Sequence, residues 1–146
     1  MPRFLPDTSC MIAALCTWHE HHTRATNEIE RRLNQGEVLV VAASALVETY
    51  AVLTRLPPPH RLSPADTWTL LGANFTGDAV ETASLTTDAY YRLLQSAPER
   101  SIAGGSIYDA VILASALTAD VDALLTFNER QFRALAVPEI EIVVPA

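Results

Sequence analysis

Three acidic side chains stand in apolar stretches of this sequence. Asp7 follows the run FLP, Glu48 interrupts VLVVAASALVETYAVL, and Asp109 lies within SIYDAVILASAL. A carboxylate in apolar surroundings must meet water, a partner or a metal ion, because desolvation of an unpaired charge costs several kcal/mol. Carboxylate oxygens are hard ligands that suit Mg²⁺ or Mn²⁺ better than Zn²⁺. We therefore expect the three side chains to share a divalent-metal centre of the kind that hydrolyses phosphodiester bonds.

Each acidic side chain also has a simpler explanation. Asp7 could cap a helix, and the segments 106–109 and 128–131 both match a capping-box pattern. Acidic residues in a first helical turn are in addition favoured by the helix dipole. Glu48 is beyond capping range of Ser44, and its neighbours are apolar. Taken singly, Asp7, Asp109 and Asn128 are better explained as caps or dipole partners, so a site requires that the positions converge.

The elements that must position these residues are short strands alternating with helices. This order predicts an α/β fold, a three-layer α/β/α domain with a central, mostly parallel sheet. The apolar run after Glu37 is typical of a strand buried on both faces of such a sheet. We expect strands at 3–6, 37–42, 79–83, 123–126 and 140–144, and helices at 8–14, 22–34, 44–56, 64–74, 87–96, 106–118 and 129–135.

The acidic residues all fall at strand-to-helix junctions or in early helix turns. Asn128, which follows the strand LLTF, occupies a fourth such junction. In parallel α/β folds, ligands bind beyond the carboxyl ends of the strands, where the following helices begin. We therefore expect Asp7, Glu48, Asp109 and Asn128 to meet at one edge of the sheet. Carboxylates a few ångströms apart repel, which raises pKa values unless a cation enters.

Composition limits the classes of function. The 146 residues suit one domain spanning 1–146, and 49% apolar against 18% charged residues disfavours disorder. The net charge is −7, and the ten basic residues are all Arg. A generic nucleic-acid-binding module would be basic, because phosphate neutralisation dominates its affinity. A metal-dependent nuclease is compatible with acidity, because its cations bridge carboxylates to phosphate.

The sequence also predicts a soluble, cytoplasmic protein. The N-terminus has an early Asp7 and lacks the long apolar region of a signal peptide. The longest uncharged apolar stretch, Val38 to Val47, is ten residues, whereas a membrane-spanning helix needs about 20.

Cysteines and histidines offer a weaker signal. Cys10 and Cys16 form no CxxC pattern, so we expect two reduced, buried thiols. The segment HEHH at 19–22 could be a transition-metal site, because His19 and His22 could share a helix face. A solvated helix start is the better explanation.

Four segments together resemble a known family. They are PDTS (6–9), ALVETYAVLTR (45–55), YDAVILASAL (108–117) and LLTFNERQF (124–132). In this order and spacing the chain resembles PIN-domain ribonucleases, specifically VapC-type toxins of toxin–antitoxin pairs. The resemblance covers essentially the whole chain. It implies a PIN-like fold, an RNA substrate, a small antitoxin partner, a homodimer and in-line hydrolysis that leaves a 5′-phosphate.

By this resemblance, Asp7, Glu48 and Asp109 would be the acidic metal-binding residues, with Mg²⁺ as the cofactor and Mn²⁺ as a substitute. Asp7 and Asp109 would hold the ion directly, and Glu48 would complete its shell or activate the attacking water. Four arginines are candidates for steering the RNA backbone, although a solvated surface Arg is the better explanation for any one of them: Arg55, Arg92, Arg100 and Arg130. The Glu48 helix could add a partner groove, although core packing explains its apolar side chains better: Tyr50, Leu53 and Leu56.

One position departs from the family pattern. Asn128 stands where many PIN domains have a fourth Asp. An amide oxygen can still bind Mg²⁺ or position water, but it lowers the negative charge of the site by one. Asp122 lies at the start of its strand and should point away from the site. Thr8, Ser9 and Thr126 could hydrogen-bond ligands or water, or could simply start helices.

Three alternatives remain open. One is a PIN nuclease of RNA processing without an antitoxin, and another is a non-catalytic PIN scaffold, which Asn128 suggests. The third is a phosphohydrolase of another α/β fold with Asp7 as nucleophile. Such an enzyme usually needs a second Asp two residues later and a Lys, whereas this chain has Ser9 there and no Lys. The third alternative therefore ranks last.

Overall fold

Strands and helices alternate along the chain as the sequence predicts. The computed structural model describes residues 1–135 and 137–146. Element bounds lie within two residues of the predicted ones. The elements are β1 (Arg3–Pro6), α1 (Thr8–Leu15), α2 (His22–Asn34), β2 (Val38–Ala42), α3 (Ala43–Thr54), α4 (Pro64–Phe75), β3 (Val80–Ala83), α5 (Thr87–Ser96), α6 (Ser106–Thr118), β4 (Ala123–Leu125), α7 (Glu129–Leu135) and β5 (Glu141–Val143).

The five strands form one parallel sheet in the order β3-β2-β1-β4-β5. From the central β1 the chain builds outward through β2 to β3, and then returns to add β4 and β5 on the other side. The order therefore reverses between β1 and β4, where Pro6 is paired with Leu125. In open parallel sheets this reversal leaves a crevice at the carboxyl ends of the two strands.

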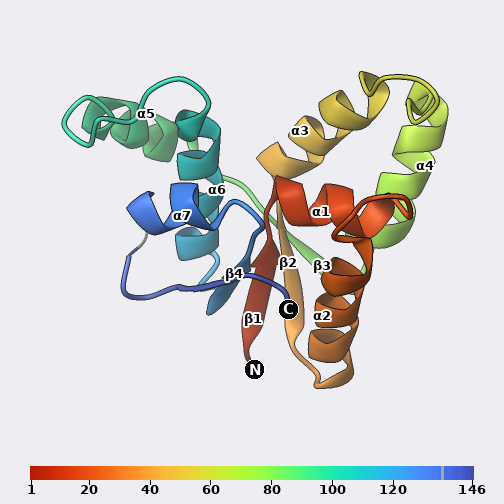
Figure 1. Ribbon diagram of the computed structural model, residues 1–146. Helices are drawn as coiled ribbons and strands as arrows, with labels where there is room; N and C mark the ends of the chain where they lie inside the picture. The colour runs from red at the N-terminus through yellow and green to blue at the C-terminus, as the bar shows by residue number, and fades with distance from the viewer. Residues whose placement is uncertain (136) are drawn as a thin grey trace.

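Helices cover both faces of the sheet. Figure 1 shows α1 and α2 on one side and α6 and α7 on the other, so the predicted three-layer arrangement is confirmed. Strands covered on both faces lose their contact with water, and side chains such as Phe4, Val40, Val41 and Leu124 are fully buried. Burying one such side chain contributes roughly 1.5–3 kcal/mol, and this packing holds the sheet edge that carries the acidic residues.

Local hydrogen bonds fix where the helices begin. The Ser63 hydroxyl accepts the Asp66 N–H at the start of α4, as the Ser-Pro sequence predicts. The start of α6 differs from the prediction. The Ser106 hydroxyl donates to the Ala103 carbonyl and accepts the Ala103 N–H, so Ser106 does not cap the helix. The capping-box explanation of Asp109 is therefore wrong.

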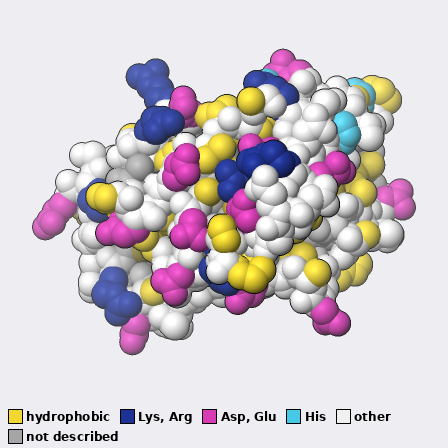
Figure 2. Space-filling view, turned by 90° about the horizontal axis from the view of Figure 1, so that it is seen from below, with side chains coloured by type: hydrophobic (Ala, Val, Ile, Leu, Met, Phe, Trp, Pro, Cys, Tyr) yellow, Lys and Arg dark blue, Asp and Glu magenta, His cyan; other side chains and the backbone are white. Residues whose placement is uncertain are grey.

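Charged side chains are spread over the surface. Figure 2 shows the face seen from below, where acidic side chains are scattered widely with a few basic ones among them. This face presents no continuous basic surface in its described part. None of the described helices combines the length and apolar character needed to cross a membrane.

Candidate metal centre

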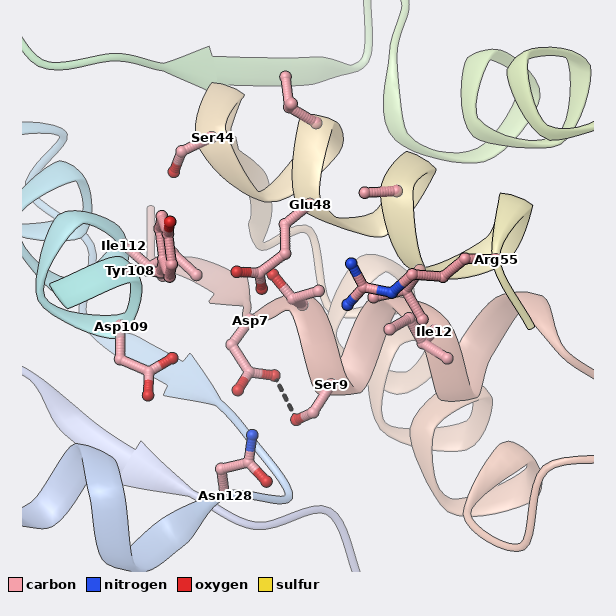
Figure 3. Close-up of a pocket in the computed structure, with 14 residues that line it drawn as sticks. Asp7, Ser9, Ile12, Ser44, Glu48, Arg55, Tyr108, Asp109, Ile112 and Asn128 are labelled. Carbon is pink, nitrogen blue, oxygen red and sulfur yellow. Dashed lines mark hydrogen bonds between the residues drawn. The ribbon is translucent and has the colours of Figure 1, made fainter. Parts of the chain in front are cut away.

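A pocket of about 720 Å³ opens at the carboxyl ends of β1 and β4. The four predicted residues, Asp7, Glu48, Asp109 and Asn128, all line it. Figure 3 shows Glu48 reaching in from α3, Asp109 from α6 and Asn128 from the segment after β4, with Asp7 between them. Side chains from two strand-to-helix connections and from early turns of two helices, α3 and α6, thus share one cavity.

Asp7 lies at the junction of β1 and α1 and is almost fully buried. Its Oδ1 accepts the Cys10 N–H at 2.8 Å and the Ser9 hydroxyl at 2.7 Å. The first contact is a helix cap, so the capping explanation of Asp7 is correct. It accounts for only part of the carboxylate, because Oδ2 accepts the Thr126 hydroxyl at 2.6 Å from beyond β4.

Two hydroxyl groups tie Asp7 to the connection between β4 and α7. The Ser9 oxygen accepts the Phe127 N–H at 3.1 Å while its hydrogen goes to Asp7 (Figure 3). The Thr126 oxygen likewise accepts the Asn128 N–H at 2.8 Å. These contacts hold the backbone that carries Asn128 at a fixed distance from Asp7. Ser9 and Thr126 therefore position a carboxylate rather than starting helices alone.

Glu48 and Asp109 flank Asp7 and are half-buried. Because β2 passes directly into α3, Glu48 lies one helical turn and a half beyond the sheet edge. Asp109 lies in the first turn of α6, which packs near α3. Both helices are held by buried apolar faces, so each carboxylate is directed into the pocket by its helix.

Burial and neighbouring negative charge raise the pKa values of Asp7 and Asp109. Burial raises the pKa of Asp7 to about 6, although hydrogen bonds from Thr126, Ser9 and the Cys10 N–H lower it; the charge of Asp109 raises it further. Burial, and then the charge of Glu48, raises the pKa of Asp109 to about 6. A bound cation would relieve both effects, since an opposite charge favours the ionised carboxylates.

The residues present suit a hard divalent cation. In this conformation the carboxylates share the pocket without meeting at one point, and no three His, Cys, Asp or Glu of the described residues are close enough to hold an ion. The donors that face the pocket are nevertheless oxygens. Cys10 is outside the residues that line the pocket, and burial raises the pKa of its thiol.

Two buried hydroxyls of the pocket support this fit. Thr8 Oγ1 and Ser44 Oγ line the pocket and have no hydrogen-bond partner within the described part of the chain. An orphaned buried hydroxyl costs about 1–3 kcal/mol. Water held on a cation in the pocket would supply the missing partners, because hydrated Mg²⁺ keeps several waters in its shell.

Arg55 is the one predicted steering arginine among the residues that line this pocket. Its guanidinium points toward Glu48 in Figure 3, and no ion pair to Arg55 is formed within the described residues. Arg100 lines a different pocket between α6 and α7. Arg92 and Arg130 are exposed and outside the residues that line the pocket. Of the four candidates, only Arg55 is therefore placed to contact a phosphate there.

Other predicted residues have structural roles. Asp122 accepts the Arg3 N–H at 2.8 Å at the opposite end of the sheet, so it points away from the site as expected. Leu53 is fully buried in the core, which excludes it from a partner groove, whereas Tyr50 is exposed. Cys10 and Cys16 are buried free thiols, as predicted.

The sequence did not reveal the residues on the far side of Asn128. His19 and His21 lie in the turn before α2, and the His21 ring stacks on Phe127. The predicted helix start of 19–22 is therefore wrong for these residues, since only His22 begins the helix. The run of His residues in the sequence gives no sign that Phe127, which follows β4, stacks on one of them.

Comparisons with known proteins agree with this geometry. A family model described as PIN domain matches residues 4–138. The chain is 40% identical over 132 residues to Ribonuclease VapC40 of Mycobacterium tuberculosis H37Rv, covering 84% of this chain and 90% of the relative. The crystal structure of the Mycobacterium tuberculosis sarcin–ricin loop cleaving toxin VapC20 is similar, with a TM-score of 0.69, 18% identity, and coverage of 92% and 96% of the two chains. A VapBC2 structure from Rickettsia felis, bound to a promoter DNA fragment, gives a TM-score of 0.68 at 14% identity over 99% of each chain.

Proposed function

Because the chain belongs to the PIN-domain family, we propose that it is a metal-dependent endoribonuclease and the toxin of a toxin–antitoxin pair. We take residues 1–146 as one PIN-like domain. Members of this family generally use divalent metal ions, and a relative of 40% identity is named a ribonuclease. The observation that carries the proposal is the position of Asp7, Glu48 and Asp109 around one pocket at the reversal point of the sheet.

We propose Asp7, Asp109 and Glu48 as the residues that hold the ion. Mg²⁺ is the cation that best suits an all-oxygen donor set, and Mn²⁺ would substitute for it. When bound, such an ion lowers the pKa of water and neutralises charge that builds on the phosphate. Asn128 offers an amide oxygen where many PIN domains have a fourth Asp, so the site carries one negative charge fewer than in those domains.

The chain's own residues divide the remaining work. Asp7 is held by three hydrogen bonds, so its oxygens keep one orientation through the reaction. Glu48 is half-buried and reaches the pocket from α3, so it would either complete the shell of the ion or take a proton from an attacking water. Arg55 offers five donors to a phosphate at the pocket wall.

The substrate we propose is single-stranded or looped RNA. Three carboxylates lie inside a crevice between α3 and α6, and a phosphodiester must enter that crevice to reach them. A nucleotide can enter after it is splayed out of a loop, whereas a paired strand keeps its backbone on a helix surface. Transfer RNA, ribosomal RNA and messenger RNA all present such loops.

We propose two protein partners, a small antitoxin and a second copy of the chain. Exposed apolar side chains lie on both sides of the pocket. Val47 on α3 is 71% exposed and lines the pocket itself, so an antitoxin bound over α3 would also block the carboxylates. On the other side, Tyr91 and Tyr108 are 60% and 61% exposed on α5 and α6, where a homodimer would bury them.

Cleavage of total cellular RNA by the purified chain tests the ribonuclease. We expect cleavage with Mg²⁺, loss of cleavage in EDTA and recovery with Mn²⁺. If the folded protein cuts no RNA in Mg²⁺ and none in Mn²⁺, the result would support the non-catalytic scaffold instead. Expression in growing cells tests the toxin, because a toxin arrests growth and its neighbouring antitoxin gene restores it, whereas an RNA-processing nuclease leaves growth unaffected.

A further inference from the structure

Five rings from three separate loops form a continuous row beside the catalytic pocket. His60 stacks on Trp18 at a centroid distance of 4.0 Å, and His21 stacks on Phe127 at 4.4 Å. His19 joins the two stacks, with centroids 5.9 Å from Trp18 and 5.5 Å from His21. We call this row the ring ladder. It brings together the α1–α2 turn, the α3–α4 loop and the segment after β4.

The ring ladder begins at the rim of the catalytic pocket. Phe127 directly precedes Asn128, and its N–H is held by the same Ser9 hydroxyl that donates to Asp7. A second cavity of about 300 Å³ is lined by His19, His21 and Phe127. It shares Ser9, Ile12 and Asn128 with the catalytic pocket. A chain that leaves the carboxylates on this side therefore passes onto the rings.

Core packing does not explain these rings. Trp18 is 47% exposed, and His60 is exposed in a loop. A single exposed tryptophan is common, but Trp18 is one of five contiguous rings, and a contiguous exposed patch is typical of a binding site. His22 differs, because its Nδ1 bonds the Ala13 carbonyl at 2.9 Å and anchors the start of α2. No metal cluster includes these histidines in the part of the chain that the structure describes.

Charges of both signs border the ring ladder: Glu20 lines the second cavity beside His21, and Arg24 contacts two of the rings. The Arg24 guanidinium lies 5.3 Å from the Phe127 ring centroid and bonds a ring nitrogen of His21. Within the described residues Arg24 forms no ion pair, so its charge is available to a phosphate. The backbone N–H of His21 donates to His19 Nδ1 at 3.0 Å, and burial lowers the pKa of the His19 ring. Because His19 Nδ1 accepts this bond, Nε2 is the nitrogen of its ring that carries a proton and can donate to a base.

We propose that the ring ladder binds, by stacking, the bases of single-stranded RNA nucleotides that flank the scissile phosphate on one side. The inference rests on the proposed ribonuclease function and adds a subsite to it. Flat rings accept any base, so the ladder would hold the strand and set its position rather than read its sequence. Arg24 would contact the backbone of the nucleotide nearest Phe127.

Equilibrium binding to an inactive chain tests the proposal. The chain carries Asp109→Asn to prevent cleavage, and the probe is a fluorescently labelled eight-nucleotide oligoadenylate. We expect Trp18→Ala to weaken binding by about 5- to 150-fold, the range found for loss of one base–aromatic stack. Trp18→Phe should keep most of the affinity, because it retains a ring. Trp68→Ala is the matched control, since Trp68 is 62% exposed on α4 and outside the ladder.

A second probe separates stacking from phosphate contacts. The same oligonucleotide with abasic residues should bind the parent weakly and should not distinguish it from Trp18→Ala. The proposal is overturned if Trp18→Ala binds oligoadenylate as tightly as the parent, if Trp68→Ala loses as much affinity, or if the abasic probe binds like the intact one.

The outcomes of the binding test and the cleavage test are independent of each other. Binding is measured on a chain that cannot cut, so its outcome does not depend on whether the active chain is a ribonuclease. If RNA is cut and the ladder variants bind normally, only this inference is overturned. If RNA is not cut by the unmodified chain, the proposed function is overturned, and Trp18-dependent binding would then mark an RNA-binding protein.

Discussion

The Thr126 hydroxyl donates a 2.6 Å hydrogen bond to Asp7 Oδ2 across a separation of 119 residues. It joins the ends of β1 and β4 at the reversal point of the sheet, and both groups are buried. The same hydroxyl accepts the Asn128 N–H. The Thr126 side chain thus sets the orientation of the Asp7 carboxylate and the position of Asn128.

Thr126→Val should lower kcat/KM by about 10- to 150-fold, because it removes a hydrogen bond to a charged group worth roughly 1.5–3 kcal/mol. Loss of this bond also raises the pKa of Asp7 further, since the bond favours the ionised form. The acid limb of the pH–rate profile should therefore shift to higher pH. Thr126→Ser keeps the hydroxyl and should restore both values. A lower rate with an unchanged pH profile would show that Thr126 acts on packing alone.

Asp7→Asn should stabilise the metal-free protein at neutral pH. The folded-state pKa of Asp7 is raised from 3.8 to about 6, so between these values the folded state binds more protons and stability falls as pH rises. Asn cannot titrate, and it still caps α1. The difference in unfolding free energy, variant minus parent, should grow by roughly 1 kcal/mol from pH 5 to pH 7.5. Urea unfolding in EDTA measures it, and a difference that shrinks with pH would contradict the assignment.

Affinity for the divalent ion should fall as pH falls. Asp7 and Asp109 have pKa values of about 6 in the metal-free protein, so protons compete with the cation below that pH. Each carboxylate is then about 10% ionised one unit below its pKa, which predicts a weakening of roughly tenfold per ligand from pH 7 to pH 5. Calorimetric titration with Mn²⁺ measures the change. An affinity independent of pH would exclude these two ligands.

Arg55→Ala should weaken RNA binding through the phosphate. Because Arg55 lines the pocket without an ion pair among the described residues, its removal should lower kcat/KM by about tenfold and reduce the salt dependence by about one unit of slope. Arg92→Ala is the matched control, because Arg92 is exposed on α5 and outside the pocket lining. Equal losses of kcat/KM in the two variants would contradict a specific phosphate contact by Arg55 and would show that both arginines act only through their positive charge.

The sequence predicted the fold well because its patterns are local. Continuous apolar runs such as VLVVA predict buried parallel strands, and Ser63-Pro64 marks a helix start without any tertiary information. Since parallel topology brings strand ends together, the positions of Asp7 and Asn128 just after such ends predicted a shared edge. These two steps need only periodicity and connectivity.

Other features of the site could not be predicted, because they depend on contacts between distant segments. Nothing near Thr126 in the sequence indicates that its hydroxyl meets Asp7, and nothing near His21 indicates the Phe127 ring. Ser106 shows the opposite error. It matches a capping box in sequence, but a local bond to Ala103 takes its hydroxyl and leaves Asp109 to the pocket.

The most direct test of the metal centre is Mg²⁺-dependent cleavage of RNA by Asp7→Asn and Asp109→Asn under single-turnover conditions. Asp78→Asn is the control, because Asp78 is exposed and lies outside the pocket. Circular dichroism should show the parent fold in all three variants. We predict a loss of at least about a hundredfold in the two pocket variants, the size expected when a group that stabilises transition-state charge is removed, and an unchanged rate in the control. Cleavage at the parent rate by either pocket variant would contradict the account.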